Sequence, residues 1–105
     1  MLRVVPCQRS ARRIVTAASG TGIGLTLLPV LYAHAGFGGT PPTASQRRFV
    51  HTLDSFSRLF TTLARDAATA DWNLGVAPHS LRAVTPDELA AVVSLAASGA
   101  PIHIH

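Results

Sequence analysis

Residues 24–32 are apolar at almost every position, and Thr26 is the one polar side chain among them. A strand with one solvated face alternates apolar and polar residues, whereas a strand covered on both faces reads as a continuous apolar run. The run therefore predicts a strand inside a parallel sheet. Pro29 is unusual there, because proline has no N–H to give to the ladder.

Segments with helical and strand-like patterns alternate along the rest of the chain. Residues 10–19 have helical composition and end before Gly20 and Gly22. Residues 72–79 and 101–105 have the pattern of two further strands. From Ser45 onward, apolar residues recur every three or four positions, which predicts a long helix with its apolar stripe at Phe49, Leu53, Phe56, Phe60, Leu63 and Ala67.

A third helix has the clearest start signal. Thr85 is an N-cap residue, Pro86 occupies the first helical position and Glu88 completes a capping box. The order helix, strand, helix, strand, helix, strand predicts an α/β fold with about three consecutive parallel strands and their helices. The third helix is expected to end at Gly99 and to bury Leu89, Val92, Val93 and Ala96.

The composition limits the classes of protein. With 105 residues the chain forms one small domain, and its net charge of +4 comes from nine arginines set against five acids. The arginines are scattered and the aromatic residues recur at core spacing, so nucleic-acid binding is not expected. An interaction module on the basic helix over residues 45–71 stays a weaker alternative. No apolar run approaches the ~20 residues that a membrane span needs.

Two features bear on where the protein works. Cys7 is the single cysteine, which excludes an intrachain disulfide and a Cys-rich zinc site and favours a cytoplasmic location. No acid precedes Asp54, and residues 33–35 after the apolar run have the small-x-small form of a cleavage site. A small non-enzymatic α/β protein with an N-terminal targeting segment therefore stays open as the alternative.

Histidine positions carry the main functional signal. His103 and His105 share one face of the expected strand at 101–105, since side chains two apart point the same way. His79 ends the strand before it, and the carboxyl ends of parallel strands meet at one edge of a sheet, where α/β active sites are built. Imidazoles side by side at this edge are suited to zinc binding or to acid–base catalysis.

Other polar residues near this edge are given ordinary roles. His34 and His51 each stand alone, so a solvated or capping role is expected for both. Tyr32, at the end of a strand, either lines a pocket or packs. Ser80 follows His79 directly, and neighbours on a strand face opposite sides, so a serine–histidine pair is not expected.

Four runs of residues, 27–39, 46–50, 75–86 and 101–105, closely resemble the formimidoylglutamate deiminase family of the amidohydrolase superfamily. The run Ala-Pro-His-Ser-Leu-Arg-Ala-Val-Thr-Pro at 77–86 is the most specific of them. The resemblance covers residues 10–105 and implies part of a (β/α)8 TIM barrel. Residues 1–9 are left as an unassigned N-terminal segment.

The resemblance implies a zinc-dependent deiminase of histidine degradation, homo-oligomeric at full length. Its small-molecule substrate is a formimino amino acid, N-formimino-L-glutamate, which it hydrolyses to N-formyl-L-glutamate and ammonia. The resemblance also implies that His105 is a zinc ligand with His103 as its inward neighbour, and that His79 and Arg82 contact the substrate.

The chemistry of these side chains agrees with the implied roles. Arg82 offers a planar fork for a carboxylate, and His79, the expected catalytic residue, would hydrogen-bond the formimino group or the attacking oxygen. Zinc would lower the pKa of its bound water and polarise the C=N carbon.

The chain also departs from the family pattern. The paired histidines of the first strand, the later strand histidine and aspartate, and the glutamate three residues after His105 are absent. One ligand cannot hold catalytic zinc, and three strands cannot close an eight-stranded barrel. The chain is therefore expected to be a fragment that is inactive alone.

Overall fold

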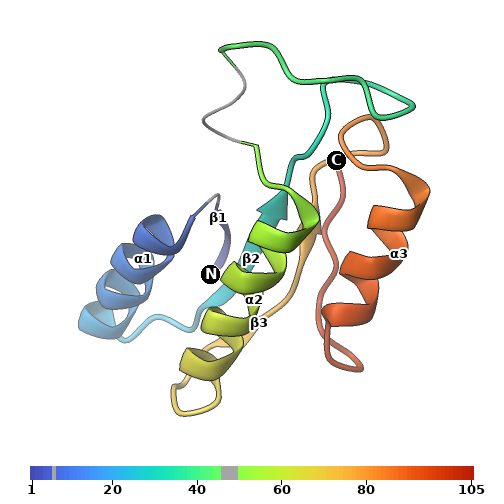
Figure 1. The fold of residues 1–105 in the computed structure, drawn as a ribbon. Coiled ribbons are helices and arrows are strands. Elements are labelled where there is room, and N and C mark those ends of the chain that lie inside the picture. Colours follow the sequence, from blue (N-terminus) through green and yellow to red (C-terminus); the bar gives the residue numbers. More distant parts are fainter. Residues whose placement is uncertain (6, 46–49) are drawn as a thin grey trace.

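The structure, a computed structural model, describes residues 1–5, 7–45 and 50–105. Strands and helices alternate along these residues (Figure 1), so the predicted α/β class is confirmed. The elements are β1 (Leu2–Val5), α1 (Gln8–Thr21), β2 (Thr26–Leu31), α2 (Leu53–Ala67), β3 (Asn73–Leu74), β4 (Ala77–Pro78) and α3 (Pro86–Leu95).

The sheet is parallel, and β2 lies at its centre. On one side β2 pairs with β1, with Leu2 opposite Thr26. On the other side it pairs first with β3 and then with β4, which are two parts of one strand interrupted at residues 75–76. Strands that follow one another in the chain are therefore neighbours in the sheet, as in a segment of a (β/α)8 barrel. Within the described residues the sheet does not close.

The central position of β2 explains its composition. Leu27, Leu28 and Leu31 have no exposed surface, as expected for a strand covered on both faces. Pro29 falls opposite the interruption between β3, which pairs as far as Leu27, and β4, which begins to pair at Val30. A proline is tolerated there because the ladder is already broken on that side.

The third predicted strand is present only as a short extended segment. Ile102 forms a single parallel bridge with Val76. Two hydrogen bonds flank that bridge, from Val76 N to Pro101 O (3.1 Å) and from His103 N to Val76 O (2.9 Å). In Figure 1 the red C-terminal segment accordingly runs beside the orange segment that contains β4. Residues 101–105 thus continue the parallel order at the edge of the sheet.

Several sequence-based boundaries differ from the structure. β1 lies within residues 1–9, for which no element was predicted. The sequence missed it because four residues carry too little pattern to distinguish a strand from a leader. The domain boundary at residue 9 stays a prediction. The second helix begins at Leu53 and not at Ser45, because the hydroxyl of Thr52 accepts a hydrogen bond from Ser55 N and caps the helix. Phe49, expected in its apolar stripe, lies outside the described residues.

The third helix is also shorter than expected. It ends at Leu95, because Ala96 already has an extended backbone, and not at Gly99. Val92 is fully buried as predicted, whereas Val93, expected on the inner face, is 39% exposed. The start of α3 is as predicted, with the capping box of Thr85 and Glu88 in place.

The three helices pack on the sheet through two apolar clusters. One joins α1 and α2 to the amino-terminal half of β2 and contains Val5, Ala11, Ala18, Leu25, Leu27, Leu59 and Leu63. The other joins α2 and α3 to its carboxyl end and contains Leu31, Ala33, Phe56, Phe60, Val76, Val84 and Val92. The second cluster includes Ala33, from the segment after β2, and Val84, from the segment after β4, so it helps to fix the positions of both segments. No helix within the described residues is both long and apolar enough to cross a membrane.

A substitution at Gly75 tests how the C-terminal segment packs against the sheet. A Cβ at this position would lie 2.2 Å from Pro101 O and 2.5 Å from Leu28 Cδ2, and backbone cannot yield to it cheaply. We expect Gly75→Ala to lower the free energy of unfolding by about 1–3 kcal/mol, measured by urea denaturation. Gly20→Ala is the matched control, because nothing lies within 4 Å of its Cβ and it sits in α1, where alanine should add about 0.5–1 kcal/mol. Equal stability of Gly75→Ala and wild type would contradict the described contact with Pro101.

Candidate functional site

A pocket of about 190 Å³ opens at the carboxyl ends of β2 and β4. One wall is the segment that follows β2 and the other is the segment that follows β4. Since the two strands are parallel neighbours, their ends meet at one edge of the sheet, where α/β proteins bind ligands. The pocket is lined by Tyr32, His34, Ala35, His79, Ser80, Arg82 and Ala83. Two of the three residues predicted for the site, His79 and Arg82, are therefore brought together.

His79 stands at the centre of the site. Its ring packs edge-on against Tyr32, with centroids 4.7 Å apart and planes at 88°, so Tyr32 both lines the pocket and packs. Burial lowers the pKa of His79, and the positive charges of His105 and Arg82 lower it further. A neutral imidazole is thereby favoured near pH 7, and a neutral ring can accept a hydrogen bond or a proton.

Ser80 contradicts the expectation from the sequence. It was predicted to face away from His79, but its Oγ lies 3.2 Å from His79 Nδ1, at hydrogen-bonding distance. The reason is that β4 already ends at Pro78, so strand alternation no longer applies at this pair. Ser80 is buried and fixes the ring, while Nε2 of His79 has no hydrogen-bond partner among the described residues and is left for a ligand.

Arg82 is exposed at the tip of the turn between β4 and α3. Within the described part of the chain it forms no ion pair with an acid. Its charge nevertheless reaches the site, because it contributes to the lowered pKa of His79. An arginine without an acidic partner beside a neutral histidine is suited to binding an anion.

His105 lies beside His79, as predicted. His105 N donates a hydrogen bond to His79 O (3.0 Å), and the two ring centroids are 6.1 Å apart. The predicted placement of these imidazoles at one edge is therefore confirmed. Their roles as catalytic residue and metal ligand stay predictions. His103, two residues earlier, is exposed, and so is His105.

The donor set of the site can be compared with what zinc requires. Catalytic zinc takes three protein ligands and keeps one position open. Among the described residues no three His, Cys, Asp or Glu side chains come close enough together to hold a metal ion. The His79 and His105 pair is thus too small a set, and no chemical step through zinc can be assigned to this chain by itself.

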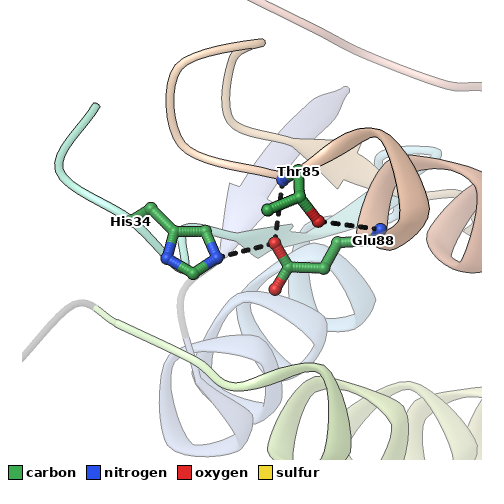
Figure 2. A network of polar contacts seen from close by, with 3 residues as sticks. All are labelled: His34, Thr85 and Glu88. Carbon is green, nitrogen blue, oxygen red and sulfur yellow. Dashed lines mark hydrogen bonds and ion pairs between the residues drawn. The ribbon is translucent and has the colours of Figure 1, made fainter. Parts of the chain in front are cut away.

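The sequence did not indicate the ion pair between His34 and Glu88 (Figure 2). His34 was expected to be solvated or to cap a helix, but its Nε2 lies 2.7 Å from Glu88 Oε1. That oxygen also accepts a hydrogen bond from Thr85 N (2.8 Å). Burial acts to raise the pKa of Glu88, but the hydrogen bonds from Thr85 and His34 outweigh it and lower the pKa. No local pattern could have indicated this contact, because 54 residues separate the partners.

His51 was expected on a helix, in a solvated or capping role. It precedes the N-cap residue Thr52, so it lies just outside α2. Its Nδ1 lies 3.1 Å from Ser55 Oγ in the first turn, and its backbone N donates to Tyr32 O (3.0 Å). His51 therefore fastens the start of α2 to the end of β2.

Larger hollows lie away from these histidines. Two of about 310 Å³ flank Trp72 beside α1, and one of about 490 Å³ lies against Met1, Arg3 and Ile23. The indole Nε1 of Trp72 is buried without a hydrogen-bond partner among the described residues. None of these three hollows is lined by a histidine, so the chemistry of the chain gathers at the smaller pocket.

Comparison with known proteins agrees with this geometry. No family model matches the chain. The crystal structure of an amidohydrolase from Brucella melitensis superposes on it with a TM-score of 0.82 and 52% sequence identity, over 90% of this chain and 21% of that one. The fold is thus that of part of an amidohydrolase.

One curated relative of the chain is a formimidoylglutamate deiminase. The curated enzyme of that name from Pseudomonas aeruginosa is 50% identical to this chain over 93 residues, which are 89% of this chain and 20% of the relative. The resemblance found in the sequence is confirmed, and the chain spans about a fifth of the length of both proteins.

The pKa of His79 tests the charge arrangement of the site. We expect Arg82→Ala and His105→Ala each to raise this pKa, because each removes a positive charge that disfavours the imidazolium. It should stay below the ordinary value of 6.5 in both variants, because burial, the largest cause, remains. Titration of the ring protons by NMR measures it. Arg58→Ala, on the exposed side of α2, is the control and should leave it unchanged; an unchanged pKa in both site variants would contradict the described placement.

Proposed function

We propose that this chain is part of a zinc-dependent amidohydrolase that converts N-formimino-L-glutamate to N-formyl-L-glutamate and ammonia. The observation that carries the proposal is the 50% identity to a formimidoylglutamate deiminase over 89% of the chain, together with His79 and Arg82 in one pocket. Because the chain spans about a fifth of that relative, the activity would be that of a longer protein.

Arg82 would bind a carboxylate of the substrate. Its guanidinium offers a rigid fork that fits both oxygens, and it has no acidic partner within the described residues. The glutamate part of the substrate carries two carboxylates, so an unpaired arginine at the pocket is matched to its charge.

His79 would orient the reacting group. Its lowered pKa keeps the ring neutral, and Ser80 holds its Nδ1, so Nε2 is the nitrogen that faces a ligand. From there it could hydrogen-bond the formimino nitrogen or the attacking oxygen and exchange a proton with either.

His105 would supply one zinc ligand, with the other ligands coming from parts of the enzyme outside this chain. Its position beside His79 would set the metal next to the reacting group. Zinc, when bound, supplies Lewis acidity. Cytoplasmic location and homo-oligomeric assembly of the full-length enzyme remain predictions from the resemblance.

The targeting alternative conflicts with the topology. Cleavage after Ala35 would remove β1, α1 and β2, and β2 pairs with β1 on one side and with β3 and β4 on the other. The remaining chain would lose the strand on which its sheet is built. The mass of the mature protein decides this point, since a chain that begins at Gly36 would rule out the fragment hypothesis.

Ligand binding tests the role of Arg82. We expect the product N-formyl-L-glutamate to shift the NMR signals of His79 and Arg82 in the 105-residue chain. Arg82→Ala should weaken binding by about tenfold or more, because a charge-assisted hydrogen bond is lost. Arg65→Ala, on the exposed face of α2, is the matched control. Equal affinity of Arg82→Ala and wild type would contradict the role.

The isolated chain should not catalyse the reaction. With zinc and N-formimino-L-glutamate we expect no more ammonia from wild type than from His105→Ala, since the described residues lack three metal ligands. Ammonia release clearly above that variant would overturn this expectation.

A chimera tests the proposed function itself. The matching fifth of the Pseudomonas aeruginosa deiminase is replaced by this chain, and ammonia release from N-formimino-L-glutamate is measured. We expect activity that His79→Ala and Arg82→Ala in the inserted segment each reduce by orders of magnitude, whereas Arg65→Ala does not. A chimera that folds and binds zinc but is inactive, or is insensitive to both substitutions, would refute the proposal.

A further inference from the structure

The turn over residues 80–85 carries Arg82 and connects β4 to α3. Inside the turn the chain makes one backbone hydrogen bond, from Ala83 N to Ser80 O (3.1 Å). Leu81 and Arg82 are exposed at its tip, whereas Ser80 and Ala83 are buried. The place of Arg82 therefore depends on how the two sides of the turn are held.

His34 holds the side of the turn nearest to Arg82 through its backbone. His34 N donates to Ala83 O (2.9 Å), and Ala33 N donates to the same oxygen (3.0 Å). Ala83 directly follows Arg82 in the chain. The end of β2 is thereby bonded to the residue next to the arginine.

The ring of His34 contacts the end of the turn, where α3 begins. Its Nε2 pairs with Glu88 Oε1, the same oxygen that accepts from Thr85 N, and Thr85 Oγ1 accepts from Glu88 N (3.2 Å) (Figure 2). The ring also lies near Gly39, where a Cβ would be 3.8 Å from His34 Cε1. His34 thus contacts the chain at two points after Arg82, directly at Ala83 and through Glu88 at Thr85.

Burial makes this ion pair more than a surface contact. The side chains of His34 and Glu88 are only 23% and 18% exposed, so water screens their attraction less than it screens an exposed pair. Both also sit at fixed points of the fold, His34 after β2 and Glu88 in the first turn of α3.

We propose that His34 is a positioning residue: its ion pair with Glu88 fixes the turn over residues 80–85 and so sets where Arg82 stands in the pocket. The structural part of the inference rests on the contacts above. The consequence for substrate rests on the proposed function, in which Arg82 binds the carboxylate. His34 acts on the substrate through the turn and not by taking part in the reaction.

Amide hydrogen exchange in the full 105-residue chain tests this proposal. We expect His34→Ala and Glu88→Gln each to speed exchange of the Ala83 and Thr85 amides by about tenfold, with no change for the buried helix residues Leu59 and Leu63. The double variant should exchange no faster at the turn than the faster single variant, because both substitutions act on the same contact. His34→Gln, which can donate to Glu88 again, should slow exchange relative to His34→Ala.

Asp87→Asn is the matched control. Asp87 lies in the same first turn of α3 and carries the same charge, but it is exposed and does not contact His34. It should leave exchange in the turn unchanged. Equal acceleration by Asp87→Asn and Glu88→Gln would attribute the effect to helix charge and overturn the proposal.

Affinity for N-formyl-L-glutamate separates the two levels of the inference. We expect His34→Ala to weaken binding while the thermal unfolding of the chain stays close to wild type, which a purely structural role would not produce. If wild type does not bind this ligand, the role of Arg82 in the proposed function fails, and exchange still decides whether His34 fixes the turn. Turn exchange within about twofold of wild type in both Glu88→Gln and Glu88→Ala would refute the positioning role, even if His34→Ala fails to fold.

Discussion

The parallel pairing of β2 on both of its edges is the constraint on which the structure depends. A strand buried on both faces has no water to satisfy its backbone, so it must give its hydrogen bonds to neighbouring strands. β1 supplies them on one side, and β3 and β4 supply them on the other. Parallel neighbours place their carboxyl ends together, and this brings the segment after β2 against the segment after β4.

The pocket that results is positively charged and partly buried. Arg82 and His105 surround His79, whose burial already disfavours its charged form. This arrangement keeps the imidazole neutral and leaves the guanidinium to attract an anion, because the positive charge of Arg82 itself disfavours the imidazolium. Tyr32 packs edge-on against the ring and Ser80 bonds its Nδ1, so both residues restrict its orientation.

The contacts that hold the pocket are distributed over segments far apart in the chain. Glu88 caps α3 through Thr85 and pairs with His34 across 54 residues. The same carboxylate therefore stabilises a local helix start and a long-range contact. A capping residue with a second partner of this kind links the integrity of a helix to the geometry of a binding turn.

The sequence by itself determined the α/β class, the central strand, the start of α3 and the placement of His79 and His105 at one edge. These features follow from residue patterns within a few positions and from the rule that parallel strands end together. Tertiary structure alone decided that residues 2–5 form β1, that Ser80 turns back to His79 and that His34 meets Glu88. Each of these depends on where a strand ends or on a partner distant in the chain. Local periodicity and propensity encode neither the end of a strand nor a distant partner, because burial and long-range hydrogen bonds exist only once the segments have packed.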